Sequence, residues 1–179
     1  MRVITGSARG CRLQTLEGND VRPTTERVKE AMFSAIQFDI EGRRVLDLFA
    51  GTGQLGIECL SRGAREAVFV DSSRDAVKIV KDNLKTCGFS APVLQMDALS
   101  YLRSCGKFDL IFIDPPYDSG VYESVLETIN SVDLLSDGGI IMCESRREKS
   151  LPEMNAPYRK VKEYNYGKVK LCLYTKENA

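Results

Sequence analysis

The chain has 179 residues and a mass of 20.0 kDa, a length that predicts one domain with no room for a second full core. Hydrophobic residues make up 43% and charged residues 28%, which excludes disordered, collagen-like and disulfide-scaffold proteins. No stretch approaches the roughly 18 consecutive apolar residues of a membrane span, and the start lacks the apolar run of a secretory signal peptide. We expect a single domain over residues 1–179, in the cytoplasm.

The sequence contains no histidine, which excludes an imidazole general base, every Ser-His or Cys-His dyad and the commonest metal ligand. We therefore expect no metal site. Tryptophan is absent too, so stacking on a nucleic-acid base must come from Tyr, Phe or Arg. The cysteines are scattered without a CxxC pair, a pattern that favours small buried side chains kept reduced. They are Cys11, Cys59, Cys87, Cys105, Cys143 and Cys172.

The formal net charge is zero, but the charges are unevenly distributed. Residues 1–29 contain six Arg or Lys against three Asp or Glu, and residues 146–179 contain nine against four. The middle of the chain is correspondingly acidic. Two basic ends can neutralise phosphates and so point to nucleic acid, although scattered Lys and Arg also cover ordinary solvated surfaces.

The first element in chain order is a predicted β-hairpin, with strands at 2–5 and 11–15 around a turn that contains Arg9. A helix follows and opens within the run Pro-Thr-Thr-Glu at 23–26, where Thr is a good N-cap and Glu suits the first turn. Its predicted apolar face consists of Val28, Ala31, Met32, Ala35 and Ile36.

Strands and helices then alternate through the middle of the chain. Four nearly continuous apolar runs are typical of parallel strands covered on both faces, and a weaker strand precedes Asp97. Two further segments near the C-terminus, 158–164 and 169–175, alternate between apolar and polar residues on either side of Asn165-Tyr166-Gly167. This pattern predicts an antiparallel hairpin. The predicted fold class is therefore α/β, with a doubly wound, Rossmann-like sheet. The strands are expected at 45–49, 67–70, 92–95, 108–113, 140–143, 158–164 and 169–175, and the helices around 55–60, 77–84, 98–104 and 121–129.

Residues 47–56 read DLFAGTGQLG and join the first central strand to its helix. Gly51, Gly53 and Gly56 form GxGxxG, in which glycines let the backbone approach a ligand and the helix N-terminus presents unpaired N–H groups. Asp71 stands twenty residues after Gly51, at the end of the next strand, where its carboxylate can accept the ribose hydroxyls of an adenosine. The pattern allows NAD and S-adenosylmethionine alike, and also a purely structural tight turn.

Asp97 follows the third predicted strand. A carboxylate there can meet an adenine amino group, or it can cap the helix that begins at Ala98. The sequence is equally compatible with both roles.

The fourth central strand runs directly into Asp114-Pro115-Pro116-Tyr117, at the carboxyl end where open parallel sheets bind ligands. An exocyclic amine on an aromatic base is a poor nucleophile because its lone pair delocalises into the ring. The Asp114 carboxylate and the Pro115 carbonyl can accept its two N–H bonds and aim the lone pair at a methyl sulfonium, while the prolines fix the backbone. Tyr117 can stack on the base, and the leaving proton can pass to Asp114 or to water.

Amino-group methylation therefore fits this motif, whereas hydride transfer to NAD has no use for it. The plain alternative is that Pro-Pro simply ends a strand and Asp-Pro starts a turn.

The motifs DLFAGTG and IDPPY, with the acid at Asp71, resemble those of class I S-adenosylmethionine-dependent methyltransferases acting on amino groups of bases. VITGSARGCRL and RPTTERVKEAMF near the N-terminus narrow the resemblance to bacterial 16S rRNA (guanine-N2)-methyltransferases, and it covers essentially the whole chain. It implies a mostly parallel seven-stranded sheet with helices on both faces. It also implies a monomer acting on the small ribosomal subunit or its assembly intermediate. Tyr117 stands where many relatives carry Phe, and either ring can stack.

The same resemblance implies the functional residues. Residues 1–22 would form an RNA-binding hairpin appended to the domain, and the segment around Arg22 and Thr24 would close over the active site. The implied catalytic residues are Asp114, Pro115, Pro116 and Tyr117, and the implied RNA-binding residues are Arg2, Arg9, Arg12, Arg22 and Arg27. The implied S-adenosylmethionine site consists of Asp47, Phe49, Gly51, Thr52, Gly53, Asp71, Ser72, Asp97, Ala98 and Thr24.

Three other interpretations stay open. An adenine-N6 methyltransferase acting on DNA or RNA would use Asp-Pro-Pro-Tyr equally well, but 179 residues leave little room for a target-recognition domain. A non-catalytic RNA-binding protein could keep the fold, although the intact glycine loop, Asp71 and Asp114 speak against it. An NAD-dependent dehydrogenase would bind a cofactor that S-adenosylmethionine does not displace.

Overall fold

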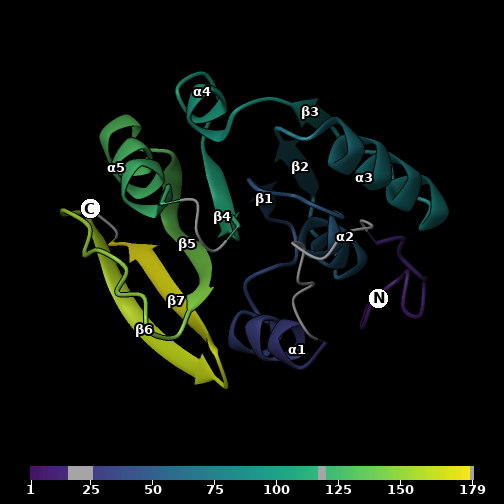
Figure 1. Ribbon diagram of the computed structural model, residues 1–179, viewed down its shortest axis with the longest axis horizontal. Coiled ribbons are helices and arrows are strands. Elements are labelled where there is room, and N and C mark those ends of the chain that lie inside the picture. Colours follow the sequence, from purple (N-terminus) through teal and green to yellow (C-terminus); the bar gives the residue numbers. More distant parts are fainter. Residues whose placement is uncertain (16–25, 117–119, 178–179) are drawn as a thin grey trace.

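The computed structural model describes residues 1–15, 26–116 and 120–177. Seven strands form one sheet in the order β3-β2-β1-β4-β5-β7-β6 (Figure 1). The strands from β3 to β5 pair in parallel, and β7 pairs antiparallel with both β5 and β6. The predicted α/β sheet with a C-terminal hairpin is confirmed. Its elements are α1 (Glu26–Ala35), β1 (Arg44–Asp47), α2 (Gln54–Ser61), β2 (Glu66–Asp71), α3 (Arg74–Thr86), β3 (Val93–Gln95), α4 (Ala98–Leu102), β4 (Phe108–Ile113), α5 (Tyr122–Val132), β5 (Leu135–Arg146), β6 (Tyr158–Tyr166) and β7 (Val169–Lys176).

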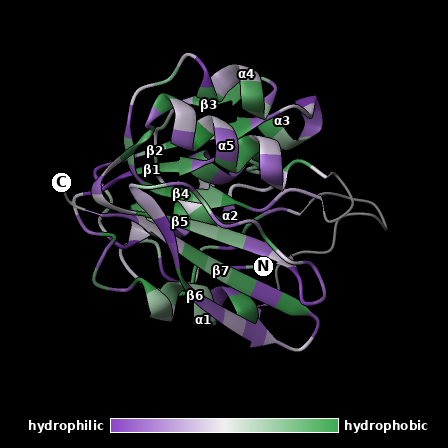
Figure 2. Cartoon of the chain, turned by 90° about the vertical axis from the view of Figure 1, so that its left-hand side faces the viewer, coloured by the Kyte–Doolittle hydropathy of each residue, from purple (hydrophilic) through white to green (hydrophobic). Residues whose placement is uncertain are grey.

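Each face of the sheet is covered by its own helices (Figure 1), and the central strands are mainly hydrophobic (green in Figure 2). Successive strand residues point to opposite faces, so Val45 packs with residues of α1, α2 and α3, whereas Leu46 packs with residues of α4 and α5. This double coverage explains why the central strands are almost continuously apolar. None of the described helices is long and apolar enough to cross a membrane.

The observed strands agree with the predicted ones except for β5, which is much longer than the expected 140–143. Leu135 pairs with Phe108 at its start, and Arg146 pairs with Val169 at its end. The polar and glycine residues near its start gave no apolar signal in the sequence. Its last residues are held by the antiparallel partner β7, which extends the sheet beyond the end of β4.

The N-terminal hairpin is present, but the two strands predicted for it are not. Within residues 1–15 the structure has a single β-bridge, between Arg2 and Arg12. The next backbone N–H groups, of Ile4 and Thr5, donate to the Glu58 carboxylate of α2 instead of to a partner strand. The hairpin therefore docks on α2 rather than extending a β-ladder.

The buried face of α1 is rotated from the predicted one. Ala35 is exposed and Ala31 is only half-buried, whereas Lys29 and Phe33 are 1% and 0% exposed. The rotation has a physical cause, because the Lys29 ammonium group pairs with the buried carboxylate of Glu58. The threonines predicted to cap this helix lie outside the described residues. The predicted positions that are buried are Val28, Met32 and Ile36.

Two of the six cysteines form a disulfide, which corrects the expectation that all stay reduced. Cys11 of the hairpin is bonded to Cys87, the C-cap of α3, and their Cα atoms lie 5.9 Å apart. The two residues are 76 positions apart in the chain, so their pairing depends on how the hairpin folds back over the end of α3. Cys59, Cys143 and Cys172 are free and buried, as expected.

Glu58 is the buried charge that joins the hairpin and α1 to α2, with 0% of its surface exposed. Its carboxylate accepts the N–H groups of Ile4 and Thr5 at 2.8 and 3.0 Å. It also pairs with Lys29 Nζ at 3.2 Å and with Arg62 Nε at 2.9 Å. Burial lowers the pKa of Lys29, and the charge of Glu58 opposes that shift. Three segments of the chain thus depend on one carboxylate.

Replacing Glu58 with alanine would leave Lys29 buried without its counter-ion and two backbone donors without their acceptor. We expect Glu58→Ala to lower the free energy of unfolding by about 3–5 kcal/mol, the range for breaking a buried ion pair. Glu177→Ala, which breaks an exposed pair with Arg159 (2.8 Å), should cost about 1 kcal/mol or less. Urea denaturation measures both changes, and equal losses would contradict the role assigned to the buried pair.

Candidate active site

The carboxyl ends of β1, β2 and β4 meet where the strand order reverses, between β1 and β4. The chain leaving β1 stays between its two neighbours. Leu48 N donates to Phe112 O of β4 at 3.2 Å, and Ala50 N donates to Val70 O of β2 at 3.0 Å. The glycine loop, residues 47–56, is thereby held over the edge where open α/β sheets bind ligands.

The glycines of this loop have two different functions. Gly51 and Gly53 have φ values of 55° and 76°, a region that disfavours residues with a side chain. A Cβ on Gly51 would meet no described atom within 4 Å, so the loop is open on that side. A Cβ on Gly56 would instead collide with the Phe69 ring. Gly51 leaves the loop open, Gly53 lies close to Val80 of α3, and Gly56 lets α2 pack closely on β2.

Asp71, at the end of β2, binds the glycine loop directly. Its Oδ2 accepts the Gly51 N–H at 2.8 Å, and its Oδ1 accepts the Ser73 N–H at 2.8 Å. A carboxylate oxygen can accept a second hydrogen bond, and this side chain is only half-buried. Asp71 can therefore hold the loop and still accept the hydroxyls of a ribose.

Asp97 is the N-cap of α4, one of the two roles that the sequence allowed. Its Oδ2 accepts from Ser100 N at 2.9 Å and from Ser100 Oγ at 3.0 Å, and these hydrogen bonds lower the pKa of Asp97. Met96 N donates to Asp71 O at 3.1 Å, so the two acids lie on neighbouring strand ends. Met96 itself is 42% exposed, an apolar surface beside the acids that sequence reasoning missed.

Asp47, predicted to bind the cofactor, is a buried anchor for α2. The residue is 2% exposed, and its Oδ2 accepts the Gly56 N–H at 3.0 Å. Burial raises the pKa of Asp47 to about 7, against the opposing effect of the Gly56 hydrogen bond and with a smaller contribution from Asp71. The carboxyl group thus fixes the helix that follows the glycine loop.

The predicted catalytic motif begins at the same edge. Ile113, the last residue of β4, pairs with Cys143 of β5, and Asp114-Pro115-Pro116 follows at once. Within this run the aspartate is half-buried, the first proline is buried and the second is exposed. Because β4 neighbours β1, the run starts next to the glycine loop. Tyr117 lies outside the described residues.

The remaining predicted cofactor residues occupy different environments. Phe49 is half-buried and packs against the core under α4 and α5, and Thr52 is buried. Ser72 is exposed at the end of β2, and Ala98 is the buried first residue of α4. Thr24 lies outside the described residues. Solvent can therefore reach Ser72 far more easily than Thr52 or Ala98.

Asn83 is a residue of this region that sequence reasoning missed. It is 0% exposed on α3, and its Nδ2 donates to Thr52 O of the glycine loop at 2.9 Å. The same side chain accepts from Gln14 N at 2.7 Å and donates to Gln14 O at 3.1 Å, at the exit of the hairpin. One amide thus joins the glycine loop to the hairpin. No local signal could reveal it, because its partners lie 31 and 69 positions away.

The arginines predicted to bind RNA are exposed wherever the structure describes them. Arg2 pairs with Glu26 of α1 at 3.3 Å, which links the hairpin to that helix. The described set comprises Arg2, Arg9 and Arg12 on the hairpin and Arg27 on α1, whereas Arg22 lies outside the described residues.

The described residues around the loop fit S-adenosylmethionine by their hydrogen-bonding chemistry. Gln54 Oε1, at the first residue of α2, is buried without a hydrogen-bond partner among the described residues. A buried acceptor of this kind needs a donor. The carboxylates of Asp71 and Asp97 add further acceptors at the neighbouring strand ends. Ribose hydroxyls, an adenine amino group and an ammonium group are the donors that these acceptors can bind.

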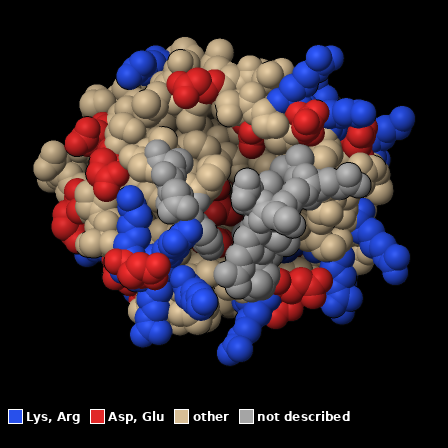
Figure 3. Space-filling model, in the orientation of Figure 1, with Lys and Arg blue, Asp and Glu red and all other residues tan. Residues whose placement is uncertain are grey.

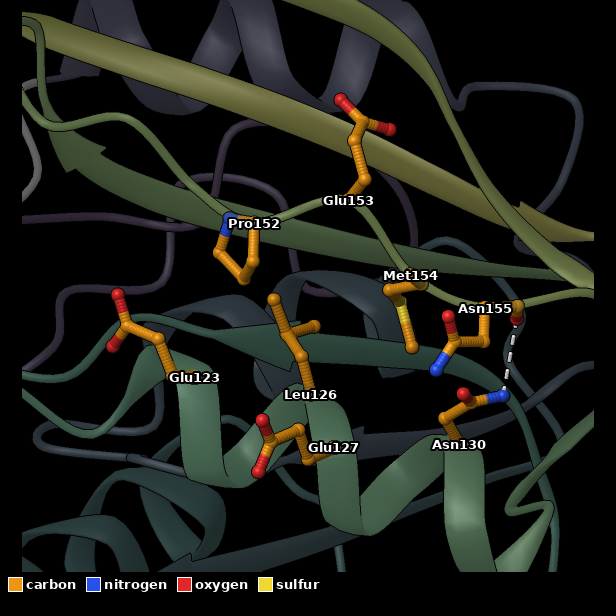
Figure 4. A pocket seen from close by; sticks show the side chains of 8 residues that line it. All are labelled: Glu123, Leu126, Glu127, Asn130, Pro152, Glu153, Met154 and Asn155. Atoms are coloured by element: carbon orange, nitrogen blue, oxygen red, sulfur yellow. Dashed lines mark hydrogen bonds between the residues drawn. The ribbon is translucent and has the colours of Figure 1, made fainter.

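A separate groove lies between α5 and the segment that leads into β6 (Figure 4). It encloses about 110 Å³, whereas typical small-molecule sites start at roughly 300 Å³. Asn130 Nδ2 donates to Asn155 O across it at 3.2 Å. Its small volume argues against a role in binding a nucleoside. Within the described part of the chain, no group of three His, Cys, Asp or Glu residues could hold a metal ion.

Comparison with known proteins adds independent observations. The family model described as Conserved hypothetical protein 95 matches residues 1–175. A Bacillus subtilis protein, YlbH, is 40% identical over 182 residues, which span 98% of this chain and 99% of that protein. The Escherichia coli protein named Ribosomal RNA small subunit methyltransferase D is 34% identical and is matched over 99% of this chain and 90% of its own length.

A solved structure also resembles this fold along its whole length. The Escherichia coli protein yhhF superposes with a TM-score of 0.86 at 32% identity, covering 100% of this chain and 99% of that one. The two chains thus share the same overall fold.

The raised pKa of Asp47 makes stability depend on pH. The folded-state pKa of about 7 lies above the ordinary value of 3.8, so the folded protein binds the extra proton and loses stability as the pH rises through this window. Asp47→Asn keeps an acceptor for Gly56 and cannot ionise. We expect this variant to gain stability over the wild type by up to about 1.4 kcal/mol per pH unit across the window.

Urea denaturation of both proteins at several pH values measures this gain. A difference in stability that stays constant from pH 3.8 to about 7 would contradict the assignment.

Proposed function

The chain belongs to the family described as Conserved hypothetical protein 95, and from this premise we propose that it is an rRNA methyltransferase dependent on S-adenosylmethionine. The acceptor in this proposal is the exocyclic N2 amine of a guanine in 16S rRNA, within the small ribosomal subunit or its assembly intermediate. The observation that carries the proposal is the Asp114-Pro115-Pro116 run, which starts beside the glycine loop at the strand-order reversal. The name of the Escherichia coli relative supports the choice of RNA.

In this proposal the glycine loop and its acids hold the cofactor. The open side of Gly51 receives it, Asp71 accepts the ribose hydroxyls and Asp97 lies near the adenine. Asp47 keeps α2 and the loop in place from the core. When bound, S-adenosylmethionine supplies a methyl group on a positively charged sulfur.

Asp114 and Pro115 act on the acceptor base. The Asp114 carboxylate and the Pro115 carbonyl oxygen accept the two N–H bonds of the amine, which directs the nitrogen lone pair out of the ring system. The fixed φ angles of the two prolines keep both acceptors preorganised. Tyr117 stacks on the base, and the proton leaves to Asp114 or to water.

The N-terminal hairpin contributes RNA affinity in this proposal. Its exposed arginines and Arg27 on α1 can neutralise backbone phosphates, and Arg22 would join them. Residues 1–22 would thus be an RNA-binding appendage of a single domain. We propose a monomer that works in the cytoplasm, where small subunits are assembled.

Transfer of labelled methyl groups from S-adenosylmethionine to small ribosomal subunits, followed by nucleoside analysis, tests the proposed function. We expect the label in N2-methylguanosine. Label in N6-methyladenosine would keep the reaction type and replace the guanine assignment. No transfer to any RNA or DNA, in a protein that still binds S-adenosylmethionine, would contradict methyl transfer itself.

Asp114→Asn should reduce the rate of methyl transfer at least about 100-fold, because the amide cannot accept the amine N–H as a carboxylate does. RNA affinity and S-adenosylmethionine affinity should stay close to those of the wild type. Asp75→Asn, an equivalent change at an exposed position of α3, should leave the rate unchanged. A rate for Asp114→Asn equal to that of this control would contradict the role of Asp114.

Asn83→Ala should weaken S-adenosylmethionine binding about tenfold, because the Thr52 carbonyl of the glycine loop loses a buried donor worth about 1–3 kcal/mol. Titration calorimetry measures the dissociation constant. Asn130→Ala, which removes the hydrogen bond from Asn130 of α5 to the Asn155 carbonyl, should leave the constant unchanged. Identical constants for the two variants would show that the loop does not depend on this amide.

A further inference from the structure

We infer that the turn of the C-terminal hairpin is a second RNA-binding surface, which binds backbone phosphates of the substrate on the side of the active site away from the N-terminal hairpin. We define this surface, the hairpin patch, by Arg147, Lys162, Lys168, Tyr164 and Tyr166. The inference rests on the proposed function and adds a contact surface to it.

The sheet topology brings the hairpin patch to the edge where the active site lies. Cys143 of β5 pairs with Ile113 at the end of β4, immediately before Asp114. Arg146 lies three residues further along β5, roughly 10 Å at about 3.3 Å per residue, and pairs with Val169. The turn between β6 and β7 therefore projects beyond the start of the catalytic motif, at the same edge of the sheet.

The turn presents two cations side by side. Arg147 N donates to the Lys168 carbonyl at 2.9 Å, so both side chains leave the backbone at one place. Arg147, Lys162 and Lys168 are exposed, and no carboxylate of the described residues lies within ion-pair distance of them. Glu148 is the exposed acid next to Arg147 and leaves the patch with a positive balance.

Other cations of the same hairpin are already neutralised. Lys160 pairs with Glu153 at 2.9 Å and with Glu163 at 3.4 Å. Lys176 pairs with Asp133 at 2.8 Å, at the opposite end of the hairpin. Two of the three unpaired cations, Arg147 and Lys168, thus lie at the turn, which is the end nearest the active site, and Lys162 lies farther along β6.

Two tyrosines extend the patch along one face of β6. The rings of Tyr164 and Tyr166 lie 6.4 Å apart at an interplanar angle of 27°, and both are half-buried. Lys162 Nζ lies 5.5 Å from the centre of the Tyr164 ring. Aromatic rings next to cations are the combination that binds single-stranded RNA, through stacking and phosphate contacts.

Helix α1 lies between the hairpin patch and the N-terminal arginines already proposed to bind RNA (Figure 1). Tyr164 and Tyr166 pack against the core cluster that contains Val28 of α1, and α1 lies between the two hairpins (Figure 1). Helix α1 carries the exposed Arg27. Figure 3 shows several Lys and Arg side chains, with Asp and Glu among them, at the lower left, where Figure 1 draws the C-terminal hairpin. RNA is a better partner for the hairpin patch than an acidic protein, because the patch lies beside the site proposed to bind an RNA base.

The triple variant Arg147→Gln, Lys162→Gln and Lys168→Gln tests the inference. At about 0.15 M salt we expect its affinity for 16S RNA and for small subunits to fall about tenfold. The plot of log affinity against log salt should be shallower by about two units, since each phosphate contact contributes roughly 0.7–0.9. KM for the subunit should rise by the same factor, whereas kcat and the KM for S-adenosylmethionine should not change.

Two matched variants separate the patch from general charge effects. Arg65→Gln, Lys81→Gln and Arg103→Gln remove three exposed cations away from the patch and should change neither affinity nor salt dependence. The second variant keeps the charge and should retain wild-type affinity. It combines Arg147→Lys, Lys162→Arg and Lys168→Arg.

A patch variant that binds RNA with the affinity and salt dependence of the wild type would overturn the inference and leave the proposed function intact. An equal loss in the control variant would also overturn it. A wild-type protein that methylates no small-subunit RNA would contradict the proposed function and this inference with it.

Discussion

The buried carboxylate of Glu58 is the constraint on which the arrangement of the molecule depends. A charge in a protein interior is tolerated only when its hydrogen-bonding capacity is filled, and here the hairpin, α1 and α2 each supply donors. Because α2 starts at the glycine loop, the same carboxylate sets the hairpin relative to the ligand edge. Asn83 fixes the other side of this junction by binding both the loop and Gln14.

The chemistry is concentrated at one edge of the sheet, and the charges are sorted around it. Carboxylates at the strand ends, Asp71, Asp97 and Asp114, can accept hydroxyls and amines. The described cations proposed to bind RNA are exposed and lie farther out, on the two hairpins and α1. This separation suits a polyanion that carries an amine into the site, since the phosphates are attracted at the rim and the amine is bound inside. The net charge of zero is therefore the sum of acidic residues at the site and basic residues around it.

Much of the fold could be predicted from local patterns. The apolar runs identified the central strands because strands covered on both faces need side chains that are apolar in either direction. The strand at 140–143 was predicted, but its extension to Leu135–Arg146 was missed, because the polar start of β5 is held by pairing with β4 and not by its own residues. The N-terminal strands were predicted in excess, since their N–H groups bond to Glu58 instead.

By itself the sequence determined the α/β class, the glycine loop and the position of Asp-Pro-Pro after the fourth central strand, because each is a strand-turn-helix or strand-turn pattern of neighbouring residues. Only the tertiary structure decided the partners of Glu58, Asn83 and Cys11 and the anchoring role of Asp47. The first three depend on contacts between segments far apart in the chain, and the last on depth of burial. The periodicity of hydrophobic residues cannot predict such pairings, because it does not distinguish a polar helix residue that faces water from one that binds a distant backbone group.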